Sequence, residues 1–217
     1  MRGKLDLEIF AYFRHLMQHE PRVALMFAGI HQLNELNPVY WSAFFNAALH
    51  QRIGCLQEAA ARELITRPIA GQLIYDDLAL DRMLRLTGGH PYFLQLLCHT
   101  LVEQANHDRR TIVTAAHVRS AVEPALMLAE AHLIGLWHEL TSAERQALAV
   151  FVPNAAPITL EQIARALDAS GTPLVRSALD VALRQLIQRD LLEFDSGQAG
   201  YIWKLELMGQ WLQRGAR

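Results

Sequence analysis

Residues 87–95 read Thr87-Gly88-Gly89-His90-Pro91-Tyr92-Phe93-Leu94-Gln95, and this stretch separates two helical patterns. Paired glycines end a helix because glycine adopts left-handed backbone conformations at little cost. Proline is tolerated in the first turn of the helix that follows. We therefore expect one helix over 76–86, with Asp76 or Asp77 as its N-cap, a tight turn, and a second helix over 91–106.

Further helices are expected on both sides of this pair. One covers 59–65 and ends before Pro68, and another covers 115–129, begins after Thr114 and is interrupted by Pro124. Residues 57–130 are therefore predicted to form a small helical domain.

The pattern changes after about residue 135. Thr141-Ser142-Ala143-Glu144 is a capping box that predicts a helix over 143–151. Helices are also expected over 159–167 and 172–189, then a β-hairpin formed by 191–194 and 201–205, and a closing helix over 208–213. Three helices followed by a hairpin is the element order of a winged helix, so 131–217 is predicted to be a winged-helix domain.

The N-terminal part carries a different signal. A helix over 7–19 is expected to end before Pro21, and the apolar run 23–28, which ends at Gly29, is typical of a buried parallel strand. A weaker strand is expected over 52–56, and the polar residues 32–37 are expected to lead into a short helical stretch. Two strands cannot complete a doubly wound sheet, so residues 1–56 are predicted to be the remnant of an α/β core. The predicted fold class is mostly α, with one or two parallel strands.

Composition excludes several classes of protein. The chain has 217 residues, 52% of them apolar and 19% charged, which argues against disorder. A net charge of −2 argues against a dedicated nucleic-acid binder. Cys55 and Cys98 form no disulfide framework, and neither a signal peptide nor an apolar run long enough to span a membrane is found. We therefore predict a cytoplasmic protein that does not interact with membranes.

Several stretches resemble bacterial AAA-like ATPases of the STAND (signal-transduction P-loop) type. Residues 13–19, 27–33 and 40–46 are similar to the second half of the ATPase core, and 87–95 is similar to the lid motif. This resemblance covers roughly residues 5–125. The stretches around Trp137, Tyr201 and Trp211 resemble the winged helix that commonly follows in these proteins.

The resemblance implies an ATP/ADP-dependent regulatory switch, in which lid and winged helix close over a nucleotide bound with Mg²⁺. That chemistry requires a phosphate loop, GxxxxGK followed by Ser or Thr, and an acidic residue after a strand. The sequence contains no such phosphate loop, and it begins where the acidic strand would already have ended. We therefore expect the P-loop to lie upstream in the same protein, and we do not expect this chain to hydrolyse ATP alone. An effector and a homo-oligomer are the other partners that the resemblance implies.

Two glycine-containing stretches are candidates for nucleotide contact by this resemblance. Gly89, His90 and Pro91 match a motif that packs near the adenine base, although a purely structural helix break explains the same residues. Gly29, Ile30 and His31 follow the predicted strand, where ligands bind in such folds. The family carries a hydroxyl residue at the position of Ile30, which cannot hydrogen-bond, and His31 is a candidate to replace it.

The remaining candidates are charged or polar side chains. Arg14 and Arg52 could stabilise phosphate charge, although such arginines more often pair with a carboxylate or extend to solvent. His15 and His19 share a helix face, but no third ligand follows, so no metal site is predicted.

The predicted helix 172–189 carries candidate DNA or partner contacts, namely Arg176, Arg184, Gln188 and Arg189. Residues 131–217 contain eight Lys/Arg and nine Asp/Glu, a net charge of 8 − 9 = −1, which favours protein packing over DNA. A non-catalytic winged-helix adaptor or DNA-binding regulator is the alternative function.

Overall fold

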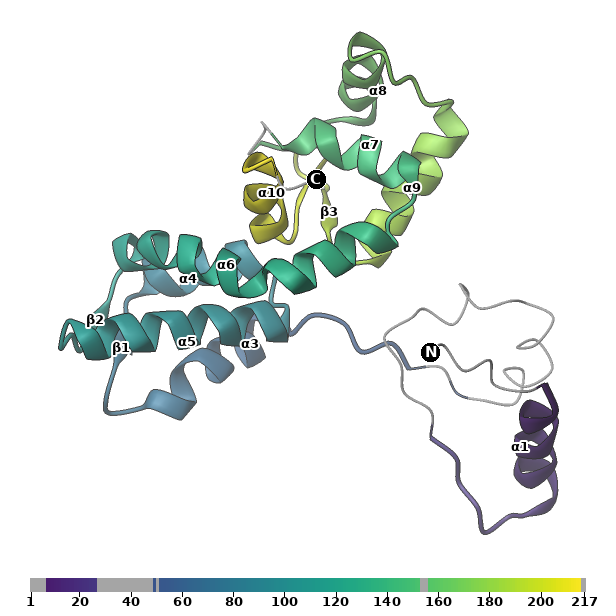
Figure 1. The fold of residues 1–217 in the computed structure, drawn as a ribbon, viewed down its shortest axis with the longest axis horizontal. Helices are drawn as coiled ribbons and strands as arrows, with labels where there is room; N and C mark the ends of the chain where they lie inside the picture. Colours follow the sequence, from purple (N-terminus) through teal and green to yellow (C-terminus); the bar gives the residue numbers. More distant parts are fainter. Residues whose placement is uncertain (1–6, 27–48, 50, 153–155, 216–217) are drawn as a thin grey trace. The chain divides into compact units, whose positions relative to one another are not determined.

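The computed structural model of the chain describes residues 7–26, 49, 51–152 and 156–215. The chain divides into two compact units, Met1–Ile53 and Gly54–Arg217. The described residues are mostly helical, so the predicted fold class is confirmed. Figure 1 shows the fold.

In the first unit, helix α1 spans Leu7–His19, with the bounds predicted from the sequence. The strand predicted over 23–28 is wrong for residues 23–26, which form no regular structure and leave Met26 95% exposed. An apolar run becomes a buried strand only where neighbouring strands pair with it, and no described strand does so. Residues 27–28 lie outside the described residues, and so do residues 32–37, which are predicted to lead into a short helical stretch.

The first half of the second unit is a helical bundle. Its helices follow the predicted order with small shifts at their ends: α3 (Glu58–Thr66), the 3₁₀ turn η2 (Arg67–Ile69), α4 (Asp77–Thr87), α5 (Pro91–His107) and α6 (Ala115–Glu139). Asp76 is the N-cap of α4, because its carboxylate accepts a hydrogen bond from the Ala79 N–H at 2.6 Å. Figure 1 shows α5 and α6 running side by side through much of their length.

A small parallel sheet joins two of these helices at their starts. Strands β1 (Ile74–Tyr75) and β2 (Ile112–Val113) pair in register, with Ile74 opposite Ile112. The sequence did not predict them, since two residues give no detectable alternation. The N-caps of α4 and α6 directly follow the two strands, so the sheet aligns the starts of these helices.

Helix α6 runs without a break through Pro124 and ends at Glu139, ten residues beyond the predicted end at 129. The predicted interruption is therefore wrong. Proline removes one backbone donor, but packing of buried residues on both sides of it, such as Val122 and Leu126, holds the helix together. The predicted domain boundary at 130/131 falls inside this helix.

The second half of this unit contains helices α7 (Ser142–Phe151), α8 (Leu160–Ala169) and α9 (Arg176–Gln188), the antiparallel strands β3 (Leu192–Asp195) and β4 (Gly200–Trp203), and helix α10 (Glu206–Gln213). Helix α9 begins four residues later than the predicted 172. Ile158, before α8, bridges to Tyr201 and adds a third extended segment to the hairpin. The order of three helices and a hairpin is as expected.

The C-terminal helix α10 connects the two halves. It packs against α4 and α6, and Glu206 and Arg214, at its two ends, form ion pairs with Arg82 and Glu123. The buried apolar side chains of both halves form a single continuous core. The helical bundle and the C-terminal helices are therefore one packed body.

Candidate functional site

The glycine turn between α4 and α5 adopts the left-handed conformation that its sequence predicts. Gly88 has φ of 56° and Gly89 has φ of 73°, and the Gly88 N–H closes α4 on the carbonyl of Leu84 at 2.8 Å. The His90 N–H then bonds to the carbonyl of Thr87 at 2.9 Å, and Pro91 begins α5. The turn is therefore fixed by backbone hydrogen bonds on both sides.

Backbone from two distant segments encloses this turn. A Cβ on Gly88 would lie 2.4 Å from the Lys204 carbonyl oxygen, and one on Gly89 would lie 2.5 Å from the Leu56 carbonyl oxygen. The Leu56 N–H also bonds to the Gly89 carbonyl at 2.9 Å. These approaches leave no space for a side chain at either glycine.

The same contacts explain why the weak strand predicted over 52–56 is wrong. These residues form no strand. The end of the segment instead bonds to the glycine turn through Leu56, so the turn takes the backbone donor that a sheet would have taken.

His90 caps the start of α5 without a side-chain hydrogen bond, and its Nδ1 is buried without a partner in the described structure. Its ring lies 4.9 Å from Phe93 and 6.2 Å from the ring of His132 on α6. Burial, and then the neighbouring His132, lower the pKa of His90, while Asp190 acts in the opposite direction. The turn therefore holds a half-buried imidazole whose pKa is lowered.

An exposed aromatic pair lies beside His90. The ring of Tyr92 stacks on His132, with ring centres 4.4 Å apart. Phe93 packs edge-on against both rings beneath them. The start of α5 and the middle of α6 thus present an aromatic surface next to the glycine turn.

An ion pair lies on the other side of the turn. Lys204, whose carbonyl touches Gly88, donates a hydrogen bond from Nζ to Asp190 Oδ1 at 2.8 Å. Burial lowers the pKa of Lys204, but the hydrogen bond and charge of Asp190 outweigh it, and the net pKa is raised. Asp190 has φ of 58°, an unusual conformation for a residue other than glycine, which places its carboxylate beside Lys204.

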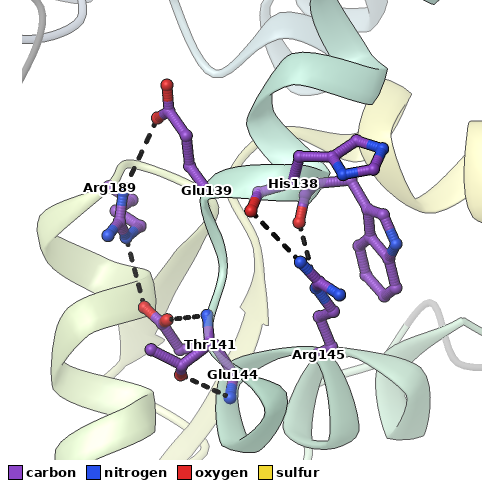
Figure 2. A network of polar contacts seen from close by, with 7 residues as sticks. His138, Glu139, Thr141, Glu144, Arg145 and Arg189 are labelled. Carbon is purple, nitrogen blue, oxygen red and sulfur yellow. Dashed lines mark hydrogen bonds and ion pairs between the residues drawn. The ribbon is translucent and has the colours of Figure 1, made fainter.

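A second polar cluster fixes the junction between α6 and α7 (Figure 2). The Arg145 guanidinium donates to the carbonyls of Trp137 and His138 at 3.1 Å each and lies 5.4 Å from the Trp137 ring centre. These carbonyls end α6, where a cation is favoured by the helix dipole. Arg145 therefore caps the longest helix from the first turn of the next one.

Glu144 and Arg189 form the other half of this cluster (Figure 2). Glu144 is fully buried, accepts the Thr141 N–H at 2.7 Å and pairs with Arg189 Nε at 3.2 Å. Arg189 also reaches Glu139 at 3.9 Å. The predicted contact residue Arg189 thus holds α9 against the start of α7.

The other predicted site residues fall in three groups. Gly29, Ile30 and His31 lie outside the described residues. Arg14, exposed on α1, and Arg52, also exposed, belong to the first unit and not to the unit that contains the glycine turn. The exposed face of α9 carries Arg176, Arg184 and Gln188.

The described residues hold no cluster of three or more metal-ligating side chains. His15 and His19 stack with ring centres 4.3 Å apart. A groove of about 390 Å³ lies between α7 and α9, lined by Thr141, Ala143, Ser177, Ala178, Val181, Ala182 and Gln185. No helix within the described ranges is both long and apolar enough to cross a membrane.

Sequence reasoning missed Lys204, Asp190, Leu56 and His132 as neighbours of the turn. Their contacts join segments far apart in the chain, and no spacing in the sequence records that proximity. The one usable signal was the glycine pair itself, since two adjacent glycines indicate close approach of other backbone.

A comparison with models of known protein families finds no match, and a search of curated proteins finds no similar relative.

Proposed function

We propose that this chain is the C-terminal portion of a STAND-type, AAA-like ATPase that acts as an ATP/ADP-dependent regulatory switch. In this proposal a P-loop upstream in the same protein binds the nucleotide. The helical bundle is the lid, and the C-terminal helices and hairpin form a winged helix that closes with it. The nucleotide is ATP or ADP with Mg²⁺, and the output is passed to an attached effector.

The observation that supports the proposal is the position of the Gly88–Pro91 turn. It resembles a nucleotide-contacting motif, and it is held between Leu56, before the lid, and Lys204, after the hairpin. A ligand bound against this turn would be sensed by both halves of the unit, because any shift of the turn must move the Lys204 backbone. This coupling is what a nucleotide-dependent switch requires.

The first test is the size of the native polypeptide in its source cells, measured by blotting with an antibody against this chain. A band well above 24.5 kDa supports an upstream P-loop. A band at 24.5 kDa contradicts the proposal, because the 217 residues contain no phosphate loop.

The second test uses the longer protein. We expect Pro91→Ala to weaken ADP and ATP binding several-fold in calorimetric titrations. Pro68→Ala is the matched control, since Pro68 also lies in the first turn of a helical segment but is not part of the glycine turn. Equal nucleotide affinity in both variants would contradict a role for the turn in binding.

The alternative is a winged-helix adaptor or DNA-binding regulator. It is favoured by the exposure of Arg176 and Arg184 on α9. Burial raises the pKa of Tyr201 in the hairpin, and the charges of Asp180 and Arg184 on α9 act on it in opposite directions. Duplex binding that weakens steeply with salt and is lost in Arg184→Ala would favour this alternative.

A further inference from the structure

Two histidines lie one turn apart on the exposed surface of α1. His15 and His19 are both exposed, and their rings stack with centres 4.3 Å apart and planes inclined by 25°. Side chains four positions apart share one face of a helix, so the two imidazoles can reach a common point in solvent. Their spacing alone predicts no metal site, since no third ligand follows, but a hydrogen bond at the pair adds a second observation.

This hydrogen bond fixes the tautomer of His19. Its Nδ1 lies 3.0 Å from the carbonyl oxygen of His15. A carbonyl oxygen can only accept, so Nδ1 carries the hydrogen and Nε2 of the neutral ring carries the lone pair. Metal-binding histidines almost always donate their other ring N–H in this way, which orients the ring and makes the binding nitrogen more basic. His19 therefore already has the hydrogen bonding of a metal ligand.

The surroundings of the pair favour a cation. His19 is the last residue of α1, where the carbonyl end of the helix dipole attracts positive charge. The adjoining positions 11, 12, 16 and 18 carry no lysine or arginine that would repel a metal ion. Among the described residues, none forms a hydrogen bond with a ring nitrogen of His15. The His15 ring is therefore able to turn a lone pair towards Nε2 of His19.

We propose that His15 and His19 form a binding site for a divalent transition-metal ion, with both imidazoles as ligands and water in the remaining positions. Imidazole nitrogen suits Cu²⁺, Ni²⁺ and Zn²⁺, whereas Mg²⁺ and Ca²⁺ prefer oxygen ligands. The site is therefore separate from the Mg²⁺ of the proposed nucleotide switch. Two protein ligands are fewer than a structural zinc site has, so the ion is exchangeable, and Cu²⁺ binds more tightly than Ni²⁺ or Zn²⁺.

The movement that binding requires is small. Two nitrogens bound to one ion at about 2.0–2.1 Å each lie about 3 Å apart, and the ring centres are already 4.3 Å apart. The rings must turn out of their stack so that both lone pairs point at the ion, which exposed side chains do rapidly. Because the ion bridges one helical turn, it binds folded α1 better than unfolded α1 and stabilises the helix.

The first test is calorimetric titration of the full chain with NiCl₂ in a buffer that does not coordinate metal. We expect His15→Gln and His19→Gln each to weaken Ni²⁺ binding by about tenfold or more, because a single imidazole loses the advantage of two linked ligands. His138→Gln is the matched control and should bind as the wild type does. His138 is exposed in the last turn of α6, and Ile134 lies one turn before it. Equal Ni²⁺ affinity in all three variants overturns the proposal.

A second test locates the ion, since the chain has ten histidines. Hydrogen exchange of the full chain is followed by mass spectrometry with and without ZnCl₂. At free Zn²⁺ ten times its Kd, exchange of the α1 amides should slow by about tenfold, and exchange in α8, which contains no histidine, should not change. Slowing in His19→Gln as large as in the wild type, or none in α1 of the wild type, overturns the proposal.

Restoring the pair at another spacing separates chelation from the loss of one histidine. Gln18→His added to His19→Gln places the second imidazole three positions after His15, on the same face, and should recover Ni²⁺ binding. Glu20→His added to His19→Gln places it five positions away and beyond the end of α1, and should not. Both double variants contain the same number of histidines. Equal Ni²⁺ affinity in the two would show that the ion does not bridge one face of α1.

Discussion

At the scale of single residues, Gly89 combines two constraints that can be separated by experiment. Its positive φ disfavours any side chain, and the Leu56 carbonyl occupies the space that a Cβ would need. Gly71 has a similar φ of 80° but no atom within 4 Å of the Cβ position. Comparing substitutions at Gly89 and Gly71 therefore distinguishes backbone strain from steric exclusion.

We expect Gly89→Ala to lower the free energy of unfolding by clearly more than Gly71→Ala. The left-handed conformation alone costs an alanine about 1–2 kcal/mol, and only Gly89→Ala adds the displacement of Leu56. Urea denaturation of both variants measures the difference. Equal losses would show that the 54–56 segment moves aside freely and does not enclose the turn.

His90 makes stability depend on pH. Its pKa in the folded protein is lowered from the ordinary value of 6.5, so below that pH the unfolded chain binds a proton that the folded chain resists. The contribution of a neutral His90 is therefore complete above pH 6.5 and is lost as the pH falls below it.

We expect the urea midpoint to fall as the pH drops below about 6.5, the reference pKa of histidine. The fall should be smaller in His90→Asn, which keeps a good helix-capping residue. His99→Gln is the control, because His99 is an exposed histidine on the same helix, paired with Glu103. If both variants keep the full pH dependence, other groups are responsible for it.

At the scale of elements, the α6–α7 junction depends on one buried carboxylate. Glu144→Gln keeps the side-chain shape but removes the charge that pairs with Arg189. Breaking a buried ion pair costs about 3–5 kcal/mol. Because the Arg189 side chain is 20% exposed, we expect Glu144→Gln to lower the free energy of unfolding by about 3 kcal/mol, the lower end of that range. The exposed pair of Arg67 and Glu63 is the control, since Arg67→Ala should cost less than about 1 kcal/mol. Thermal unfolding that ranks the two variants equally would contradict the assigned role of Glu144.

Replacing Pro124, in contrast, is expected to make the protein more stable. A proline inside a helix removes one backbone hydrogen bond and costs about 3 kcal/mol relative to alanine. Because α6 is already continuous, Pro124→Ala should recover about 1–3 kcal/mol. Pro68→Ala should gain nothing, since Pro68 lies in the first turn of a helical segment, where proline is tolerated. A destabilised Pro124→Ala would show that α6 needs the proline for its path.

Comparing the predicted elements with the observed ones shows which features can be predicted from neighbouring residues alone. The capping box at Thr141 and the cap at Asp76 are local signals, and the structure contains both as the sequence predicts. The prediction of a strand over 23–28 is wrong for the described residues 23–26, because a strand depends on pairing partners elsewhere in the chain. The pair β1 and β2 could not be predicted for the same reason. The glycine turn was predicted, whereas its enclosure by Leu56 and Lys204 depends on long-range packing.

At the scale of the whole molecule, the second unit contains a single continuous core. Helix α6 belongs to both the predicted lid and the predicted winged helix, and α10 packs back onto α4 and α6. A proposed switch that separates lid from winged helix must therefore detach α10 and break the pairs of Glu206 with Arg82 and Arg214 with Glu123. Differential binding of ATP and ADP would have to supply that free energy.

The same continuity predicts that residues 54–217 fold by themselves as one cooperative body. The core residues of this unit all lie between Ala61 and Leu212, so removing 1–53 takes none of them away. We expect a single thermal transition within a few degrees of the full chain, and an unchanged near-ultraviolet circular dichroism signal from the packed Trp203 and Trp211. Two separate transitions would mean that the bundle and the C-terminal helices are energetically independent despite their shared core. In that case lid and winged helix could part without breaking a common core, and the nucleotide would need far less differential affinity to move them.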